Sequence, residues 1–146
     1  MTHERVLFDT SCLIAGMVQT HVNHTRVAPW LARAARGEIT GLVCTHSLAE
    51  TYAILTSMPL RPRIQPGAAL SAIHQNLATF EFIPLTQQDY QDILEEMVSI
   101  GLAGGVIYDA LAAKAALIAG ANILLTLNAK DFLRLGPAVS TLVLEP

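Results

Sequence analysis

The chain has 146 residues, of which 52% are hydrophobic and 14% charged, and its formal net charge is −3. This length and composition fit one domain with a single core, which we place at residues 1–146, and they exclude a disordered chain. Twelve Asp and Glu against nine Lys and Arg exclude a broadly basic surface, so nucleic acid has to be held by a local patch or a surface completed by oligomerisation.

No segment of the sequence predicts a membrane span or a signal peptide. The longest apolar stretch, residues 115–127, is about 13 residues long and therefore too short to cross a bilayer. The first apolar run, from Val6, ends at Asp9, which is too early for a signal peptide. Cys12 and Cys44 are isolated among apolar residues, which favours buried, reduced thiols in a cytoplasmic protein.

In the first half of the chain, short apolar runs predict strands, and apolar residues at helical spacing predict helices. The predicted elements are a strand at 6–8, a helix at 11–18, a helix at 27–34 that ends at Gly37, a strand at 39–44, and a helix from Ser47 to Leu55 that Pro59 stops. A polar break at 21–25 separates the first two helices, and Ser47 with Glu50 has the spacing of a capping box.

The second half of the chain continues this alternation after a loop between Pro62 and Pro66. Its predicted elements are a helix at 68–77, a strand at 80–84, a helix that starts at Thr86 and ends at Gly101, an Ala-rich helix at 108–118, a strand at 123–126, a short helix at 131–135 and a strand at 139–144. Strands that alternate with helices in this way imply a parallel sheet of an α/β fold, covered by helices on both faces.

Acid and amide side chains lie near the ends of several predicted strands. Asp9 and Asn128 come at or just after two strand ends, and Glu50 and Asp109 are predicted in the first turns of helices. Because parallel sheets place functional groups at the carboxyl ends of their strands, we expect these side chains to converge. Each acid also has an ordinary explanation: Asp9 as a helix N-cap, Glu50 as part of the capping box, and Asp109 as a complement to the helix dipole.

Considered together, the acids predict a metal site. Carboxylates that are brought together repel one another unless a cation lies between them, and oxygen ligands suit Mg²⁺ or Mn²⁺. Such a cation activates water and stabilises charge on a phosphoryl oxygen, so phosphodiester hydrolysis fits these residues better than acyl transfer. No serine lies in a nucleophile-elbow sequence, which argues against a Ser-His-Asp site.

Four motifs, in order along nearly the whole chain, carry a resemblance to a known family. They are FDTSCLIA at 8–15, HSLAETYAIL at 46–55, YDALAAKAA at 108–116 and LLTLNAKDF at 124–132. With these motifs the chain resembles PIN-domain proteins, and specifically the VapC-type toxins of bacterial and archaeal toxin–antitoxin pairs. The resemblance implies an α/β/α sandwich with a central, mainly parallel sheet, cleavage of RNA with Mg²⁺ or Mn²⁺, a homodimer, and inhibition by a cognate antitoxin.

The resemblance also implies roles for individual residues. Asp9 and Asp109 match the principal metal ligands of the family, and Glu50 matches the acid that orients or activates the attacking water. The fourth acidic position falls on Asn128, which brings no charge, so a second metal site is in doubt. Asp131, three residues later, either substitutes for it or caps the short helix, and capping is the simpler expectation.

Further residues resemble the surroundings of the family's site. Ser11 and Thr126 match small hydroxyl residues that would orient carboxylates through hydrogen bonds. Arg61 and Arg63, in the Pro-rich loop, are together with Lys130 and Arg134 the best candidates for contacts to the RNA backbone. The alternative is that the two loop arginines are only solvated.

The histidines are not expected to bind metal. His21, His24 and His46 match no zinc-binding spacing. Either His24 or His46 could instead lie at the rim of the site and contact an RNA phosphate.

We therefore predict a single PIN-like domain that is a metal-dependent endoribonuclease, the toxin of a type II toxin–antitoxin pair. The competing hypothesis is a catalytically weak PIN module that binds RNA or a protein partner, which Asn128 and the lack of a basic surface favour. A signalling domain with a phosphorylated aspartate is disfavoured because it needs a pair of adjacent acids on the first strand, where the chain has only Asp9.

Overall fold

The computed structural model describes residues 3–146, so the first two residues of the expected domain lie outside it. A sheet at the centre of the molecule has five strands in the order β3-β2-β1-β4-β5, and neighbouring strands pair in parallel. The strands are β1 (Arg5–Phe8), β2 (Thr40–Cys44), β3 (Glu81–Ile83), β4 (Ile123–Leu125) and β5 (Val143–Leu144). The expected parallel sheet is therefore confirmed.

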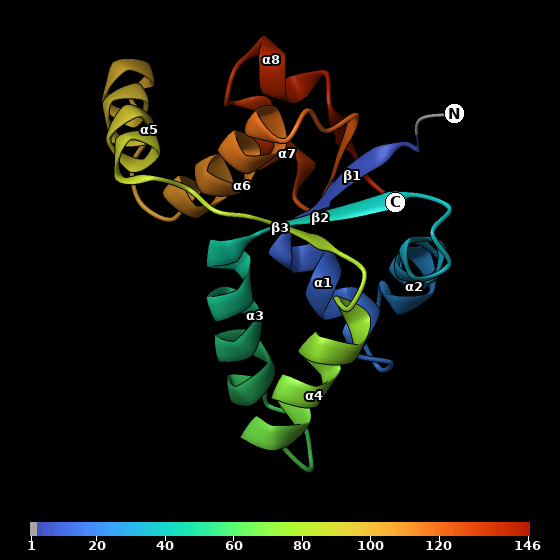
Figure 1. The fold of residues 1–146 in the computed structure, drawn as a ribbon. Helices are drawn as coiled ribbons and strands as arrows, with labels where there is room; N and C mark the ends of the chain where they lie inside the picture. Colours follow the sequence, from blue (N-terminus) through green and yellow to red (C-terminus); the bar gives the residue numbers. More distant parts are fainter. Residues whose placement is uncertain (1–2) are drawn as a thin grey trace.

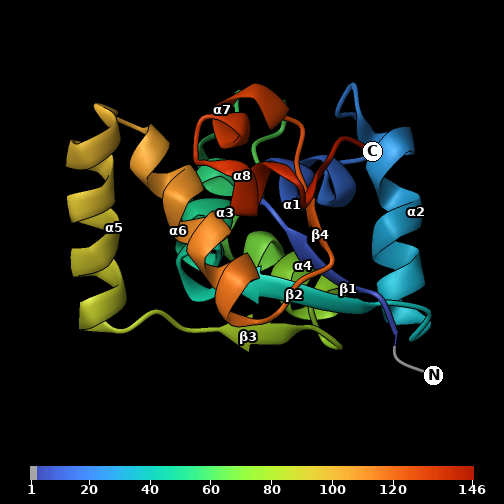
Figure 2. The same ribbon diagram turned by 90° about the horizontal axis from the view of Figure 1, so that it is seen from above.

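Helices form a layer on each side of this sheet (Figure 1). One layer holds α1 (Thr10–Met17), α2 (His24–Ala35), α3 (Thr45–Ser57) and α4 (Pro66–Asn76). The other holds α5 (Gln87–Ile100), α6 (Val106–Ile118), α7 (Ala129–Leu133) and α8 (Pro137–Ser140). The view from above places α5 and α2 at opposite sides of the molecule (Figure 2). This is the expected α/β/α sandwich. Across residues 3–146, no helix combines the length and apolar character needed to span a bilayer.

The central strand β1 is buried on both faces. Val6 and Phe8 pack with the layer of α1 to α4, and Leu7, between them, packs with the layer of α5 to α8. The Phe8 ring meets Phe80 edge-on at 5.0 Å, and Phe80 lies so close over Gly41 that a Cβ there would be 2.7 Å from its ring. This packing holds the end of β1, and with it Asp9, in a fixed place.

Several helices begin earlier than the sequence predicts, among them α4 and α6 by two residues each. The helix α2 begins at His24, three residues before the predicted start at Val27, and α7 begins at Ala129 instead of Asp131. The helix α3 begins at Thr45, directly after β2, with the extended residue Cys44 as its N-cap. The spacing of Ser47 with Glu50 therefore predicted a helix start two residues too late, because α3 has no side-chain cap at its first residue.

The C-terminal strand is shorter than predicted. The segment 139–144 was expected to be one strand, but only Val143–Leu144 pairs with the sheet. Gly136, with φ at +97°, turns the chain, and Pro137 opens the short helix α8. An apolar run alone does not distinguish a buried helical turn from a strand.

Candidate active site at the carboxyl ends of the strands

Asp9 is a buried carboxylate at the end of the central strand, with 6% of its surface exposed. It is the N-cap of α1, as expected, because its Oδ1 accepts a hydrogen bond from the backbone N–H of Thr10 at 2.8 Å. The hydroxyls of Ser11 and Thr126 both donate to its Oδ2 at 2.9 Å. Ser11 and Thr126 are therefore in hydrogen-bond contact with the carboxylate that they were expected to orient.

The same two hydroxyls also accept hydrogen bonds from the segment that follows β4. The backbone N–H of Leu127 donates to Ser11 Oγ at 3.1 Å, and the backbone N–H of Asn128 donates to Thr126 Oγ1 at 2.9 Å. The loop after β4 is thereby tied to Asp9, and the rotamers of both hydroxyl side chains are fixed.

Asp109 lies in the first turn of α6, where the other acids act on it. Burial, followed by the charges of Asp9, Asp131 and Glu50, raises the pKa of Asp109 to about 7, and Arg134 opposes this. Burial also raises the pKa of Asp9, although its hydrogen-bond donors oppose the shift. We call Asp9, Glu50, Asp109 and Asp131 the acid cluster, because their charges meet at one edge of the sheet.

Glu50 lies in the second turn of α3 and forms no capping box, so its expected place in the first turn is wrong. Its Oε1 is 2.8 Å from Nδ1 of His46, one turn earlier on the same helix. The His46 ring stacks on Tyr108 of α6, with ring centroids 5.1 Å apart and planes 16° apart. The i,i+4 spacing of His46 and Glu50 is the sequence signal for this contact, and the capping-box interpretation obscured it.

The structure gives Asp131, and not Asn128, an influence on the charge of the site. Asn128 is exposed at the N-cap position of α7 and makes no side-chain cap. Asp131 is not the cap of this helix, so that expectation is wrong; its charge acts on Asp109, and its Oδ1 accepts a hydrogen bond from Arg134 at 3.2 Å. Asp131, rather than Asn128, therefore brings a fourth negative charge to the acid cluster.

The chemistry of this cluster fits a hard divalent cation. The negative charges of Asp9, Asp131 and Glu50 raise the pKa of Asp109, and Arg134 is the cation that opposes this effect. Across residues 3–146, no three His, Cys, Asp or Glu side chains are arranged to hold a metal ion by themselves. Mg²⁺ commonly binds one or two carboxylates and keeps several waters, so a pair of carboxylates can be enough to hold it.

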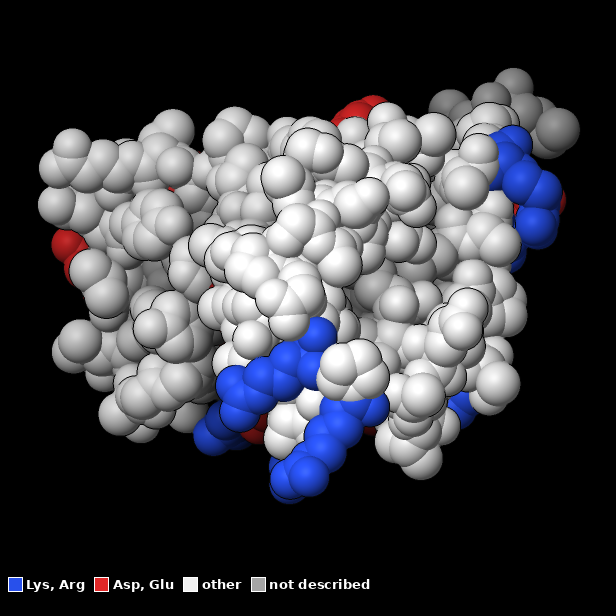
Figure 3. All heavy atoms as spheres, turned by 90° about the horizontal axis from the view of Figure 1, so that it is seen from below, with Lys and Arg blue, Asp and Glu red and all other residues white. Residues whose placement is uncertain are grey.

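The basic residues expected at the RNA lie outside the acid cluster. Arg61 and Arg63 are exposed in the loop between α3 and α4, where they line a shallow hollow with Pro62, and Lys130 is exposed on α7. Figure 3 looks at the molecule from the side of that loop and shows Lys and Arg side chains gathered near one edge of a largely uncharged face. His24 is engaged elsewhere, because its Nδ1 is 2.9 Å from the carbonyl oxygen of Ala15.

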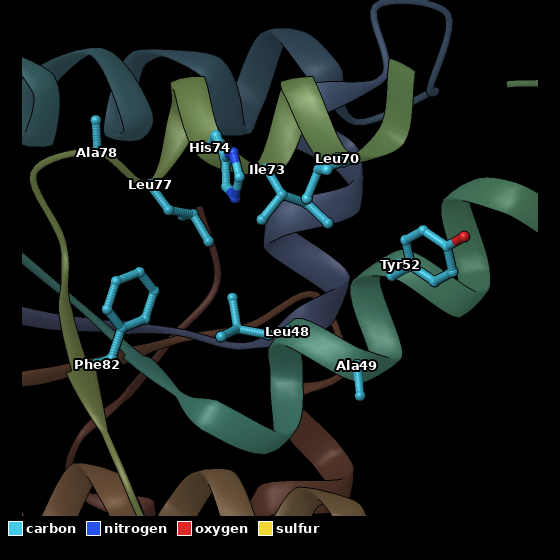
Figure 4. A pocket seen from close by; sticks show the side chains of 9 residues that line it. All are labelled: Leu48, Ala49, Tyr52, Leu70, Ile73, His74, Leu77, Ala78 and Phe82. Carbon is cyan, nitrogen blue, oxygen red and sulfur yellow. The ribbon is translucent and has the colours of Figure 1, made fainter. Parts of the chain in front are cut away.

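An apolar groove of about 570 Å³ opens between α3, α4 and β3. Figure 4 shows the side chains that line this α3/α4 groove, which are Leu48, Ala49, Tyr52, Leu70, Ile73, His74, Leu77, Ala78 and Phe82. Tyr52, Leu70 and Phe82 each expose at least two fifths of their surface. Ala49, which lines the groove, directly precedes Glu50 of the acid cluster on α3.

Sequence comparisons identify the family of the chain. The model of the PIN domain matches residues 6–136. Ribonuclease VapC27 of Mycobacterium tuberculosis is 32% identical over 108 residues, which cover 74% of each chain. Ribonuclease VapC40 of the same species is 30% identical over 116 residues, which cover 80% of this chain and 81% of the relative.

Solved structures share the fold at lower sequence identity. VapBC2 of Rickettsia felis, bound to a DNA fragment from its promoter, superposes with a TM-score of 0.68 at 19% identity and covers 97% of this chain and 98% of that one. VapC20 of M. tuberculosis, a toxin that cleaves the sarcin–ricin loop, superposes with a TM-score of 0.64 at 16% identity over 82% and 86% of the two chains. The chain belongs to the PIN-domain family and, within it, to the VapC proteins.

Proposed function

We propose that this protein is an endoribonuclease that hydrolyses RNA phosphodiester bonds with Mg²⁺ or Mn²⁺, and that it is the toxin of a type II toxin–antitoxin pair. The observation that carries the proposal is the acid cluster, in which burial and neighbouring carboxylates raise the pKa of Asp109 to about 7. Such a cluster is costly without a cation and suited to one. The VapC relatives named as ribonucleases support the reaction.

In the proposed mechanism, Asp9 and Asp109 would hold the cation, and the hydroxyls of Ser11 and Thr126 keep the Asp9 carboxylate in one orientation. When bound, the cation increases the acidity of a water and stabilises charge on a phosphoryl oxygen. Glu50 positions the attacking water and accepts its proton. The water oxygen forms a bond to phosphorus as the bond to the 3′ oxygen breaks, which leaves a 5′-phosphate and, after protonation, a 3′-hydroxyl.

The roles of the remaining side chains follow from their positions. Asp131 supplies the fourth negative charge, and Asn128, at the exposed start of α7, contributes to the surroundings of the site. Arg61, Arg63 and Lys130 would contact RNA phosphates from outside the acid cluster, because all three are exposed cations. Two free, buried cysteines fit a cytoplasmic protein.

We also propose that a cognate antitoxin covers the α3/α4 groove. The apolar lining and the exposed rings of Tyr52 and Phe82 suit the apolar face of a partner helix, and a VapBC complex shares the fold. An antitoxin bound there could also reach a basic side chain into the acid cluster. A Phe82→Glu substitution should weaken binding of the antitoxin and leave RNA cleavage unchanged.

A homodimer is supported by the outer face of α5. Tyr90, Leu94 and Val98 recur there at i, i+4 and i+8, and Val98 is 81% exposed. An apolar stripe of this kind is costly in water unless a partner covers it, and a second copy offers a matching surface. Sedimentation should show a dimer for the wild type and a monomer for Val98→Glu.

The test of the proposed activity is cleavage of a mixed pool of structured RNAs with Mn²⁺, with Mg²⁺ and with EDTA, by wild type and by Asp9→Asn. Metal-dependent cutting by the wild type alone is the expected result. A folded, antitoxin-free protein that binds the cation but does not cut RNA would instead be the binding module considered above, which the ribonuclease relatives do not favour.

A further inference from the structure

The side chains of His46, Glu50 and Tyr108 form a chain of contacts between α3 and α6, beside the acid cluster. His46 Nδ1 lies 2.8 Å from Glu50 Oε1. Because a carboxylate only accepts hydrogen bonds, Nδ1 carries the hydrogen and donates it. The His46 ring also stacks nearly parallel on Tyr108, with the ring centroids 5.1 Å apart. One histidine ring thus holds Glu50 and is itself held by the first turn of α6.

This contact limits the motion of a side chain that would otherwise be mobile. Glu50 keeps 29% of its side chain exposed, and a free glutamate samples many rotamers. The hydrogen bond from His46 engages Oε1 alone, which leaves Oε2 available to a water. We propose that His46 is a positioning residue that fixes the Glu50 carboxylate for the attacking water, with Tyr108 as the support of its ring.

Tyr108 links this arrangement to the other side of the site. It directly precedes Asp109 in the first turn of α6, so the stack joins the helix that carries Glu50 to the helix that carries Asp109. A shift of α3 against α6 would change the distance between the water-positioning acid and a cation-holding acid. The inference rests on the proposed function, because it assigns His46 a role only through Glu50.

A second pair in the chain offers a matched control. Gln88 Nε2 donates to Asp92 Oδ1 at 2.8 Å on α5, with the same length and the same i,i+4 spacing as the His46–Glu50 hydrogen bond. The helix α5 carries none of the site residues. If the His46–Glu50 pair only stabilised its helix, then removing either donor would affect RNA cleavage equally little.

Two substitutions at His46 separate its two contacts. His46→Phe keeps an aromatic ring against Tyr108 and removes the donor, whereas His46→Asn keeps an N–H donor near the position of Nδ1 and removes the ring. With Mn²⁺, we expect His46→Phe to lower kcat about ten- to a hundredfold without changing KM, as when the partner that orients an active-site ligand is lost. His46→Asn should recover most of this loss, and Gln88→Leu should cleave like the wild type.

A double-mutant cycle with Glu50→Gln, followed in single-turnover reactions, tests whether His46 acts through Glu50. His46→Phe should cause no further loss in the Glu50→Gln background, and thermal unfolding should show every variant to be folded. Equal cleavage by His46→Phe and wild type, or the same loss in both backgrounds, would overturn the role of His46 and leave the proposed function standing. A folded wild type that cuts no RNA with Mn²⁺ would overturn the proposed function and this inference together.

Discussion

Thr126 donates its hydroxyl hydrogen to Oδ2 of Asp9 at 2.9 Å, across 117 positions of the sequence. Thr126 is fully buried, and its Oγ1 also accepts a hydrogen bond from the backbone N–H of Asn128. One hydroxyl therefore joins the end of β1 to the loop after β4. The orientation of the central carboxylate depends on the pairing of these two strands, which brings the two residues together.

Replacing Thr126 with Val removes this hydroxyl at nearly constant volume. The buried Asp9 carboxylate and the Asn128 N–H each lose a partner, so we expect a loss of about 1–3 kcal/mol in the free energy of unfolding. We also expect RNA cleavage to fall about ten- to a hundredfold. Urea denaturation and cleavage rates provide the measurements. Thr126→Ser keeps the hydroxyl and is the control; equal losses in both variants would contradict the role given to the hydrogen bond.

Asp9→Asn should abolish the activity and preserve the fold. Asparagine caps a helix about as well as aspartate, so α1 remains capped, but the negative charge that holds the cation is gone. We expect cleavage to fall about 10²- to 10³-fold or more, and the metal-free variant to melt at or above the temperature of the wild type, because a buried carboxylate no longer has to be ionised. A clear loss of stability with normal cleavage would mean that Asp9 is only a cap.

The metal-free protein should become less stable as the pH rises from about 5 to 8. The pKa of Asp109 is about 7 in the folded protein, above its ordinary value of 3.8, and the pKa of Asp9 is raised as well. The folded state therefore binds protons more tightly than the unfolded state, so the stability present below pH 3.8 is lost as the pH rises through 7.

Calorimetry in EDTA at several pH values measures the slope of the unfolding free energy against pH. Asp109→Asn should flatten it, and the exposed Asp92→Asn on α5 should leave it unchanged. Adding Mn²⁺ should raise the melting temperature of the wild type more at pH 8 than at pH 5, because protons compete with the cation for the carboxylates. A melting temperature that rises with pH in the metal-free wild type would contradict the prediction.

Asp131 should matter more to cation binding than Asn128 does. The charge of Asp131 reaches Asp109, whereas Asn128 is exposed and uncharged. Asp131→Asn should weaken Mn²⁺ binding in calorimetric titrations and slow RNA cleavage at low Mn²⁺, and Asn128→Ala should change both less. The reverse order would restore Asn128 to the role that the family resemblance suggests.

Arg61 and Arg63 should govern how RNA affinity depends on salt. If each contacts one phosphate of single-stranded RNA, its replacement by Ala should lower the slope of log K against log salt by about 0.7. Each arginine substitution is made in the Asp9→Asn background, which binds RNA without cutting it, and the RNA affinity is measured at several salt concentrations. Arg36→Ala is the control, because Arg36 is paired with Glu38 just before β2, at the opposite end of the strands. An unchanged slope in Arg61→Ala and Arg63→Ala would remove both from the RNA interface.

The order of strands and helices was readable from the sequence because each element carries a local signal. Val6, Leu7 and Phe8 are uniformly apolar, as a strand buried on both faces must be. The helix expected from Thr86 begins there, with Thr86 and Asp89 forming a capping box. The convergence of Asp9, Glu50 and Asp109 also followed, since parallel strands direct their carboxyl ends to one edge.

Only the tertiary structure decided which partner each site residue meets. The spacing of Ser47 and Glu50 suggested a capping box, but Glu50 contacts His46 instead. The His46 ring in turn stacks on Tyr108, which comes from a helix far along the chain. The choice between Asn128 and Asp131 likewise depended on where α7 begins and where its first turn points. Local sequence determines which elements form, because propensities, caps and apolar patterns act over a few residues. Contacts between elements depend on packing and register, which residues far apart in the chain determine together.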